Sequence, residues 1–371
     1  MASGEPIAIE FDGLIRNVRR SAQNEELYIA PGFVDIQVNG FAGVDYNSPS
    51  TPHEQIARSI HVLHSTGVAR FYPTVITGGP DEMAGALANL ARAKESLPQG
   101  DSMEGFHVEG PHIYPDEGPR GAHPVQWVRP PDIDEFRRLQ DAARGYIRLV
   151  TLAPEWPGAT QYIEALVSEG IAISIGHTNA GGEQIADAVS AGATMSTHLG
   201  NGAHAVLRRH PNYIWEQMAE DRLMASFIAD GIHLPASFLK VALRAKGLDR
   251  SVLVTDATSP AACEPGRYWL GEQAVDLTAD QRVVLAGQDR LAGSALRMDR
   301  GVENLMRIGG LTLAEAVRLA TTNAACAGNV PNRQEGLAAG DCADFVLFRF
   351  DAESKAITVE ATYVNGRRVY G

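Results

Sequence analysis

Residues 171–204 read IAISIGHTNAGGEQIADAVSAGATMSTHLGNGAH and form the unit from which the fold can be predicted. The apolar run at 171–175 predicts a strand, residues 183–191 a helix, and residues 193–197 a second strand. A histidine follows each strand, at His177 and His198. Strands joined by a helical crossover lie parallel, so we expect both imidazoles side by side at the carboxyl ends of the strands, where the active sites of strand-helix barrels lie.

The same alternation of strand and helix runs through most of the chain. Six further apolar strands are predicted, at 33–38, 71–76, 104–108, 147–152, 224–228 and 251–254. Eight strands separated mostly by helices over roughly 230 residues predict a (β/α)8 barrel, which we place at residues 30–329. Within it, residues 268–285 have the pattern of a hairpin insertion.

The two ends of the chain have a different pattern. Residues 1–29 and 330–371 contain short strand-like pieces separated by turn residues. We expect these segments to form one small β-sandwich domain beside the barrel.

Composition limits the functional classes. The 371 residues carry a formal net charge of −13, which argues against nucleic acid or an anionic membrane as the main partner. The three cysteines form no C-x-x-C pair, and no apolar stretch is long enough to span a bilayer. The sequence therefore predicts a soluble, cytoplasmic protein with reduced cysteines.

Polar residues gather at the predicted strand ends. One carboxylate, Glu109, and two imidazoles, His177 and His198, would make a divalent-metal site with zinc as the leading candidate. Asp256 would act there as general base and later as general acid. The full set at strand ends is Gln37, Asn39, Glu109, His177, His198, His233 and Asp256.

Each of these residues also has an ordinary structural interpretation. An isolated histidine is usually solvated or hydrogen-bonded within the fold. Glu109 could be a loop carboxylate or a helix cap, and Asp256 could be the N-cap of the next helix, which spacing alone does not reject.

Several motifs together resemble a known family. HVEGPHI at 107–113, IGHTNA at 175–180, STHLGN at 196–201, DGIHL at 230–234, LVTDAT at 253–258 and LAGSALRMDRGVENL at 291–305 resemble the amidohydrolase superfamily, and within it the N-acetylglucosamine-6-phosphate deacetylases. The resemblance implies one metal held by Glu109, His177 and His198, with Asp256 as acid/base and His123 polarising the acetyl carbonyl. It also implies a substrate pocket lined by Ala122, Asn201, Gly202, Arg209, His233, Leu291, Ala292 and Gly293.

The implied activity is metal-dependent hydrolysis of the N-acetyl amide of N-acetylglucosamine-6-phosphate, which yields glucosamine-6-phosphate and acetate. The expected cofactor is one divalent ion, Zn²⁺ first, with Fe²⁺, Mn²⁺ or Co²⁺ as alternatives. The expected partner is an N-acetylated amino-sugar phosphate, and the resemblance also implies a homodimer.

Two departures from the family pattern affect this expectation. Gln37-Val38-Asn39 stands where many amidohydrolases have His-x-His. Amides bind divalent metals poorly compared with imidazoles, so we predict a single metal ion. The segment HLGNGAHAVLRRHPN at 198–212 also differs from the family, and Gly200 and Gly202 predict a looser or roomier loop. Arg208 and Arg209 there would hold a phosphate or form a solvated pair.

Two other functions stay open at this point. One is deacylation of a different N-acyl sugar or N-acyl amino acid at the same metal site. The other is a barrel without activity that serves as a binding protein, although joint retention of Glu109, His177, His198 and Asp256 speaks against it.

Overall fold

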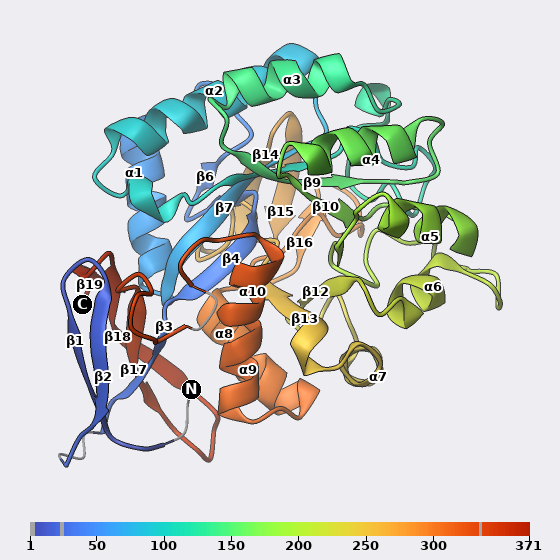
Figure 1. Cartoon of the computed structure of the whole chain (residues 1–371). Helices are drawn as coiled ribbons and strands as arrows, with labels where there is room; N and C mark the ends of the chain where they lie inside the picture. The colour runs from blue at the N-terminus through green and yellow to red at the C-terminus, as the bar shows by residue number, and fades with distance from the viewer. Residues whose placement is uncertain (1–3, 23–25, 334–335) are drawn as a thin grey trace.

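The computed structural model describes residues 4–22, 26–333 and 336–371. Residues 1–3, 23–25 and 334–335, which belong to the segments expected to form the small β-domain, lie outside the described residues. At the centre is an eight-stranded parallel sheet rolled into a barrel (Figure 1). Its strands, in order, are β4 (Phe33–Val38), β7 (Val68–Ile76), β8 (Phe106–Glu109), β9 (Ile147–Leu152), β10 (Ala172–Ile175), β11 (Met195–Ser196), β12 (Met224–Ile228) and β13 (Ser251–Val254).

All eight predicted strands are present, so the barrel prediction is confirmed. A parallel bridge between Val38 and Ala257 brings the first and last strands together and nearly closes the barrel. The β5 (Gly40–Phe41) and β6 (Val44–Asp45) pair forms a small ribbon directly after β4.

Helices surround the barrel strands (Figure 1). They are α1 (His53–His64), α2 (Pro80–Ser96), α3 (Ile133–Ala142), α4 (Ala159–Ser168), α5 (Gly182–Ser190), α6 (Tyr213–Ala219), α7 (Ala236–Lys246) and α8 (Met298–Asn304), followed by α9 (Leu313–Leu319) and α10 (Thr322–Ala327). Local sequence fixes several of their starts, as where Asp132 caps α3 through the amides of Asp134 and Glu135. None of the helices in the described part of the chain is long and apolar enough to cross a bilayer.

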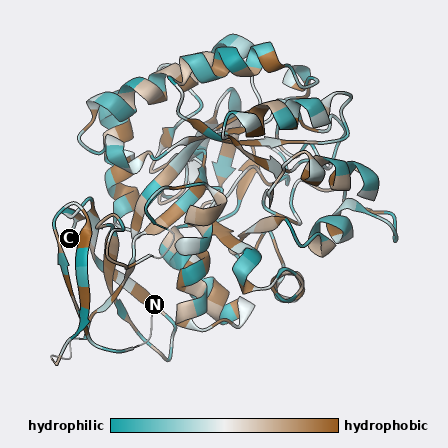
Figure 2. Cartoon of the chain, viewed as in Figure 1, coloured by the Kyte–Doolittle hydropathy of each residue, from teal (hydrophilic) through white to brown (hydrophobic). Residues whose placement is uncertain are grey.

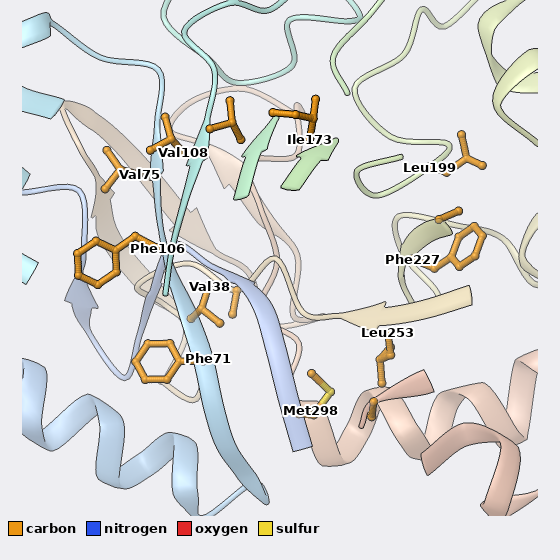
Figure 3. Packing of buried hydrophobic residues seen from close by; sticks show 14 of the residues in the cluster. Val38, Phe71, Val75, Phe106, Val108, Ile173, Leu199, Phe227, Leu253 and Met298 are labelled. Carbon is orange, nitrogen blue, oxygen red and sulfur yellow. The ribbon is translucent and has the colours of Figure 1, made fainter. Parts of the chain in front are cut away.

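The main core lies between the barrel strands and the helices. Parallel strands are covered on both faces, so they read as continuous apolar runs. Phe71, Phe106 and Phe227 are buried in this layer, and Leu253 packs near Met298 of α8 (Figure 3). Figure 2 shows hydrophobic residues along the strands and hydrophilic residues on the outer faces of the helices. Each fully buried large apolar side chain contributes about 1.5–3 kcal/mol.

The amino-terminal end of the barrel is filled by apolar side chains and by α10. Val34, Ile36 and Val252 from the strands form one buried cluster with Ala324 and Ala325 of α10. This end of the barrel is therefore closed, and only the carboxyl end is left for a site.

Both chain ends contribute to a separate antiparallel sheet, as predicted. Its strands run in the order β19 (Arg367–Tyr370), β18 (Ile357–Val364), β17 (Phe345–Phe350) and β3 (Tyr28–Pro31), and β1 (Ile7–Phe11) pairs with β2 (Ile15–Arg20) beside it. The C-terminus lies in this region of Figure 1. Asp344, just before β17, is buried and accepts hydrogen bonds from Arg70 of β7 at 2.6 Å and from Arg333 at 2.9 Å. This network joins the sheet to the barrel.

The insertion after β13 is a three-stranded antiparallel sheet. It consists of β14 (Gly266–Leu270), β15 (Gln273–Leu277) and β16 (Val283–Leu285), one strand more than a hairpin. Val275, Val283 and Leu285 pack in an apolar cluster with Ile76 at the end of β7. Since Ile76 lies at the carboxyl end of a barrel strand, the insertion covers that end of the barrel.

Candidate metal centre and active site

A layer of hydrogen-bonded side chains fills the barrel between the apolar plug and the carboxyl end. His107 Nε2 lies 2.8 Å from Oγ1 of Thr151, which lies 2.7 Å from Oγ1 of Thr197. Ser174 Oγ completes the layer at 2.6 Å from the same Thr197 oxygen. These groups satisfy one another inside the barrel, so they form a rigid polar floor beneath the strand ends.

Three side chains converge above this floor. Glu109 ends β8, while His177 and His198 follow β10 and β11. Oε1 of Glu109 lies 3.0 Å from Nε2 of His177 and 2.9 Å from Nε2 of His198, and the two nitrogens are 3.1 Å apart. All three residues are buried. The prediction that the two strand-end imidazoles lie side by side is therefore confirmed.

The backbone at these positions is unusual. His177 has a φ of 51°, His198 of 31° and Asp256 of 50°, all in the left-handed region that non-glycine residues rarely adopt. Such conformations cost about 1–3 kcal/mol each, and they cluster at functional sites, where the surrounding fold holds them. Here each one turns the chain directly after a barrel strand, at the edge of the same cavity.

The donor set fits a divalent metal ion. Nδ1 of His177 lies 2.7 Å from the carbonyl oxygen of Pro119, so this nitrogen must carry the proton. In a neutral His177 ring, Nε2 then has no proton and can only accept a hydrogen bond. Oε1 of Glu109, which faces it, is a carboxylate oxygen and can also only accept one. Such a contact needs a cation or an additional proton. An ion with bonds of about 2.0–2.2 Å in tetrahedral geometry separates its ligand atoms by roughly 3.4 Å, close to the spacing in this cluster.

Electrostatics agree with a cation site. Burial alone would raise the pKa of Glu109, but the His177 and His198 imidazoles hold it well below its ordinary value. Burial would lower the pKa of His198, yet Glu109 raises it. The cluster thus favours a bound positive charge, and metal and protons compete for the same atoms.

Asp256 lies in the same cavity. Its Oδ1 accepts a hydrogen bond of 2.7 Å from Nδ2 of Asn39. Burial, followed by the negative charge of Glu109, raises the pKa of Asp256 to about 6. A carboxylate with this pKa can accept and return a proton near neutral pH.

Gln37 and Asn39, the two amides at the end of β4, each support a carboxylate. Nε2 of Gln37 donates to Oε1 of Glu109 at 3.1 Å, while Asn39 binds Asp256. Within the described ranges, a single group of His, Cys, Asp and Glu side chains has converging ligand atoms, namely Glu109, His177 and His198. The two amides therefore orient the carboxylates of the site.

His123 reaches the cluster from the long loop after β8. Its Nδ1 lies 2.8 Å from Oγ1 of Thr77, and its ring stands edge-on to that of His177 with centroids 4.4 Å apart. Burial, followed by the charge of His177, lowers the pKa of His123 to about 3, so the ring is neutral.

The cavity at the carboxyl end of the barrel has a volume of about 410 Å³, which suits a small ligand. It brings together eleven of the thirteen predicted site residues: Glu109, Ala122, His123, His177, His198, Asn201, Gly202, His233, Asp256, Leu291 and Gly293. The other two lie outside the lining described for this cavity. Ala292 is buried in the apolar cluster of the insertion, and Arg209 is exposed on its loop.

Three charged residues of the insertion that were not predicted from the sequence also line this cavity, namely Arg282, Asp289 and Arg290. Arg290 directly precedes Leu291, which was predicted to line the pocket. Its position next to that segment could have marked Arg290 as a lining residue.

Gly200 and Gly202 pack closely and do not loosen the loop, whereas the expectation of a roomier loop stays a prediction. Both residues have positive φ, 102° and 55°. A Cβ atom at Gly202 would lie 2.7 Å from Nδ1 of His177, and one at Gly200 would lie 2.7 Å from the Phe238 ring. The glycines therefore allow close packing of the loop against the site.

Comparison with known proteins identifies the family. The model of the amidohydrolase family matches residues 28–369. The chain belongs to the amidohydrolase family. Among its relatives, N-acetylglucosamine-6-phosphate deacetylase of Bacillus subtilis is 33% identical over 328 residues, 88% of this chain and 81% of the relative. The human enzyme of the same name is 34% identical over 356 residues, 92% of this chain and 83% of the relative.

A solved structure agrees with these relatives. N-acetyl-D-glucosamine-6-phosphate deacetylase of Mycobacterium smegmatis, a mutant in complex with N-acetyl-D-glucosamine-6-phosphate, superposes with a TM-score of 0.87. Its sequence identity to this amidohydrolase is 30%, and the match covers 97% of this chain and 93% of that one. The similarity therefore includes both the barrel and the terminal sheet.

Proposed function

We propose that this amidohydrolase hydrolyses the N-acetyl amide of N-acetylglucosamine-6-phosphate to glucosamine-6-phosphate and acetate. The observation that carries the proposal is that the buried side chains of Asp256 and of the Glu109, His177 and His198 cluster share one cavity at the carboxyl end of the barrel. Relatives at 33–34% identity over most of the chain, which bear this enzyme name, support the choice of substrate.

Glu109, His177 and His198 would hold one divalent ion, with Zn²⁺ favoured by the combination of two imidazoles and one carboxylate. When bound, such an ion lowers the pKa of water and polarises the acetyl carbonyl. Pro119 contributes by fixing the His177 tautomer, as groups behind metal ligands commonly do.

Asp256, as a carboxylate, takes a proton from the attacking water and later gives it to the departing amine. Asn39 orients this carboxylate by its bond to Oδ1. The Thr77 hydroxyl can donate to Nδ1 of His123, which leaves the His123 proton on Nε2 to stabilise the oxyanion.

The remaining lining residues would hold the sugar. Nδ1 of His233 lies 2.6 Å from Oδ2 of Asp230, which orients the ring within the cavity. Arg209 is exposed on its loop and lies outside the lining of this cavity, and we propose it as a substrate contact from that loop. The other proposed contacts are Ala122, Asn201, Gly202, His233, Leu291 and Gly293, with Ala292 packing behind them.

Assembly and location complete the proposal. A homodimer is implied by the family resemblance, and Val206 and Trp215, which are 88% and 47% exposed, offer apolar surface for it. Light scattering coupled to gel filtration would measure the mass. All three cysteines are free, which supports a reducing, cytoplasmic location.

Acetate release from a panel of substrates tests the proposed activity. The panel contains N-acetylglucosamine-6-phosphate, unphosphorylated N-acetylglucosamine and an N-acetyl amino acid. We expect fastest release from the phosphorylated sugar. Metal-loaded protein that cleaves the amino acid instead would assign the site to another N-acyl substrate.

A further inference from the structure

Asp35 of β4 is a buried carboxylate that has no part in the proposed reaction. Its Oδ2 accepts a hydrogen bond of 2.5 Å from Oγ1 of Thr255. Its Oδ1 accepts one of 3.2 Å from the amide of Thr255 and one of 3.3 Å from the amide of Gln37. An ionised carboxylate only accepts hydrogen bonds, so these three donors match it and hold it in one orientation.

The contacts of Asp35 cross the seam of the barrel. β4 and β13 stand at the two ends of the strand order, and the bridge between Val38 and Ala257 joins them. Thr255 directly follows β13, and its amide donates to the Asp35 side chain, where a paired strand would offer a backbone carbonyl. Asp35 therefore takes the place of a backbone acceptor at the point where the barrel closes.

The Thr255 hydroxyl extends this contact to the residues around the proposed general base. While Oγ1 donates its proton to Asp35, it also accepts a hydrogen bond of 3.1 Å from the amide of Ala257. Thr255 and Ala257 are the two neighbours of Asp256 in the chain. The Asp35 carboxylate thus restrains the main chain on both sides of Asp256.

Ser294 holds the same segment through its carbonyl groups. Its Oγ donates to the carbonyl of Thr255, and its amide donates to the carbonyl of Asp256 at 2.9 Å. The amide of Thr258 in turn donates to the carbonyl of Ser294 at 3.0 Å. Residues 255–258 are therefore bonded to Asp35 on one side and to Ser294 on the other.

These bonds account for the backbone conformation of Asp256. Its φ of 50° lies in the left-handed region, which a residue other than glycine keeps only when the surrounding structure enforces it. Asn39 holds the Asp256 side chain, whereas Asp35 and Ser294 hold the main chain that carries it. The direction of the Asp256 carboxylate depends on both kinds of contact.

We propose that Asp35 is a positioning residue for the general base and acts through the Thr255 hydroxyl to hold the main chain of Asp256 in its left-handed conformation. This inference rests on the proposed function, because it takes Asp256 as the group that accepts the proton of the attacking water. Without the Asp35 contact, residues 255–257 relax and the carboxylate leaves its place in the cavity. A displacement of about 1 Å at a reacting group can lower the rate about 10²-fold.

The test compares Asp35→Asn, Thr255→Val and Thr255→Ser with the wild type, using N-acetylglucosamine-6-phosphate at about pH 8. Both carboxylates are ionised there, because burial raises the pKa of Asp35 to about 7 and that of Asp256 to about 6. We expect kcat to fall about 10–100-fold in Asp35→Asn and in Thr255→Val. KM and metal content should change little. Thr255→Ser keeps the hydroxyl and should retain most of kcat.

Thr362→Val is the matched control. Thr362 is also buried, and its Oγ1 donates to the carbonyl of His64 at 2.7 Å, in the terminal sheet away from the cavity lining. This substitution removes a buried hydroxyl without touching the seam at Thr255, so kcat should stay near that of the wild type.

Combining Asp35→Asn with Asp256→Asn separates positioning from a general loss of structure. Since Asp35 acts only through the Asp256 carboxylate, the double variant should have the same kcat as Asp256→Asn alone. If Asp35→Asn lowers kcat by the same factor in both backgrounds, the inference is overturned, because Asp35 then only supports the fold. Loss of metal from Asp35→Asn would also overturn it.

The Thr255 pair decides the matter if Asp35→Asn does not fold. Equal losses of kcat in Thr255→Ser and Thr255→Val would overturn the inference, because the hydroxyl would then not be the group that acts. If the wild type cleaves the sugar phosphate and the variants keep its kcat, the inference fails while the proposed function stands. A metal-loaded wild type that releases no acetate overturns both.

Discussion

Asn39 donates a hydrogen bond of 2.7 Å to Asp256, although 217 residues separate them in the chain. Asn39 follows the first barrel strand and Asp256 follows the last, and the bridge between Val38 and Ala257 joins the same two strands. The orientation of the proposed general base thus depends on closure of the barrel at this seam.

This bond gives a prediction for the dependence of activity on pH. Burial and Glu109 raise the pKa of Asp256 to about 6, whereas the Asn39 bond lowers it. The carboxylate is the active form, so activity should fall as pH drops through this pKa. Asn39→Ala should shift the acidic limb to higher pH.

The profile should be measured with unphosphorylated N-acetylglucosamine, because a sugar phosphate itself ionises near pH 6. Asn89→Ala, which removes a buried amide of α2 remote from the cavity lining, is the control for general loss of packing. An acidic limb that stays in place in Asn39→Ala would disprove this link.

Asp256→Asn removes the base but keeps the shape of the side chain. We expect kcat to fall about 10²–10⁴-fold, the usual range for a general acid/base. Metal content should not change, because Glu109, His177 and His198 remain. A variant with near-normal kcat would exclude Asp256 as the base.

The metal cluster can be tested by elemental analysis. His177→Ala and Glu109→Gln should each lose stoichiometric metal, since each removes one of three converging ligand atoms. His61→Ala, on the exposed face of α1, should retain it. Affinity should also weaken as pH falls, because protons compete for the imidazoles and the carboxylate. Full metal occupancy in His177→Ala would contradict the assignment.

We expect the Asp344 carboxylate to contribute most of the stability with which the terminal sheet is held on the barrel. Burial would raise its pKa, but Arg333 and Arg70 hold that pKa below the ordinary value. Its carboxylate therefore stabilises the fold above about pH 4, and this contribution is lost as pH falls through the depressed pKa. Asp344→Asn should lower the free energy of unfolding by about 3–5 kcal/mol at pH 7.

Urea unfolding at several pH values would measure this effect. The difference between wild type and Asp344→Asn should shrink at acidic pH. Asp249→Asn is the control, because Asp249 pairs with Arg318 while 80% exposed and should matter little. A difference that is small at pH 7 would mean that the Arg70 and Arg333 network does not anchor the sheet.

The barrel could be predicted from sequence because its strands are buried on both faces. Residues such as 147–152 therefore form apolar runs bounded by turns, and each run predicted one strand. The metal cluster followed from the same pattern, since parallel strands place Glu109, His177 and His198 at a common end.

The insertion was harder to predict, because its strands lack a continuous apolar run. Its position on the barrel also depends on tertiary packing. In β14, for example, most residues are exposed or half-buried, so the pattern gives a weak strand signal. Arg282 and Arg290 face the cavity only because the apolar side of β16 packs on Ile76. Gly202 was predicted to loosen its loop. In the structure the absence of a Cβ atom instead allows the backbone to pack closely against His177.

The most direct test of the central claim is deacetylation of N-acetylglucosamine-6-phosphate by metal-free protein titrated with Zn²⁺, with acetate and the free amino sugar quantified together. We predict equal amounts of both products and a rate that rises linearly to a plateau at one ion per chain, with Asp256→Asn inactive at the plateau. Equal rates with and without metal, or no acetate from fully loaded protein, would contradict a metal-dependent deacetylase centred on Glu109, His177 and His198.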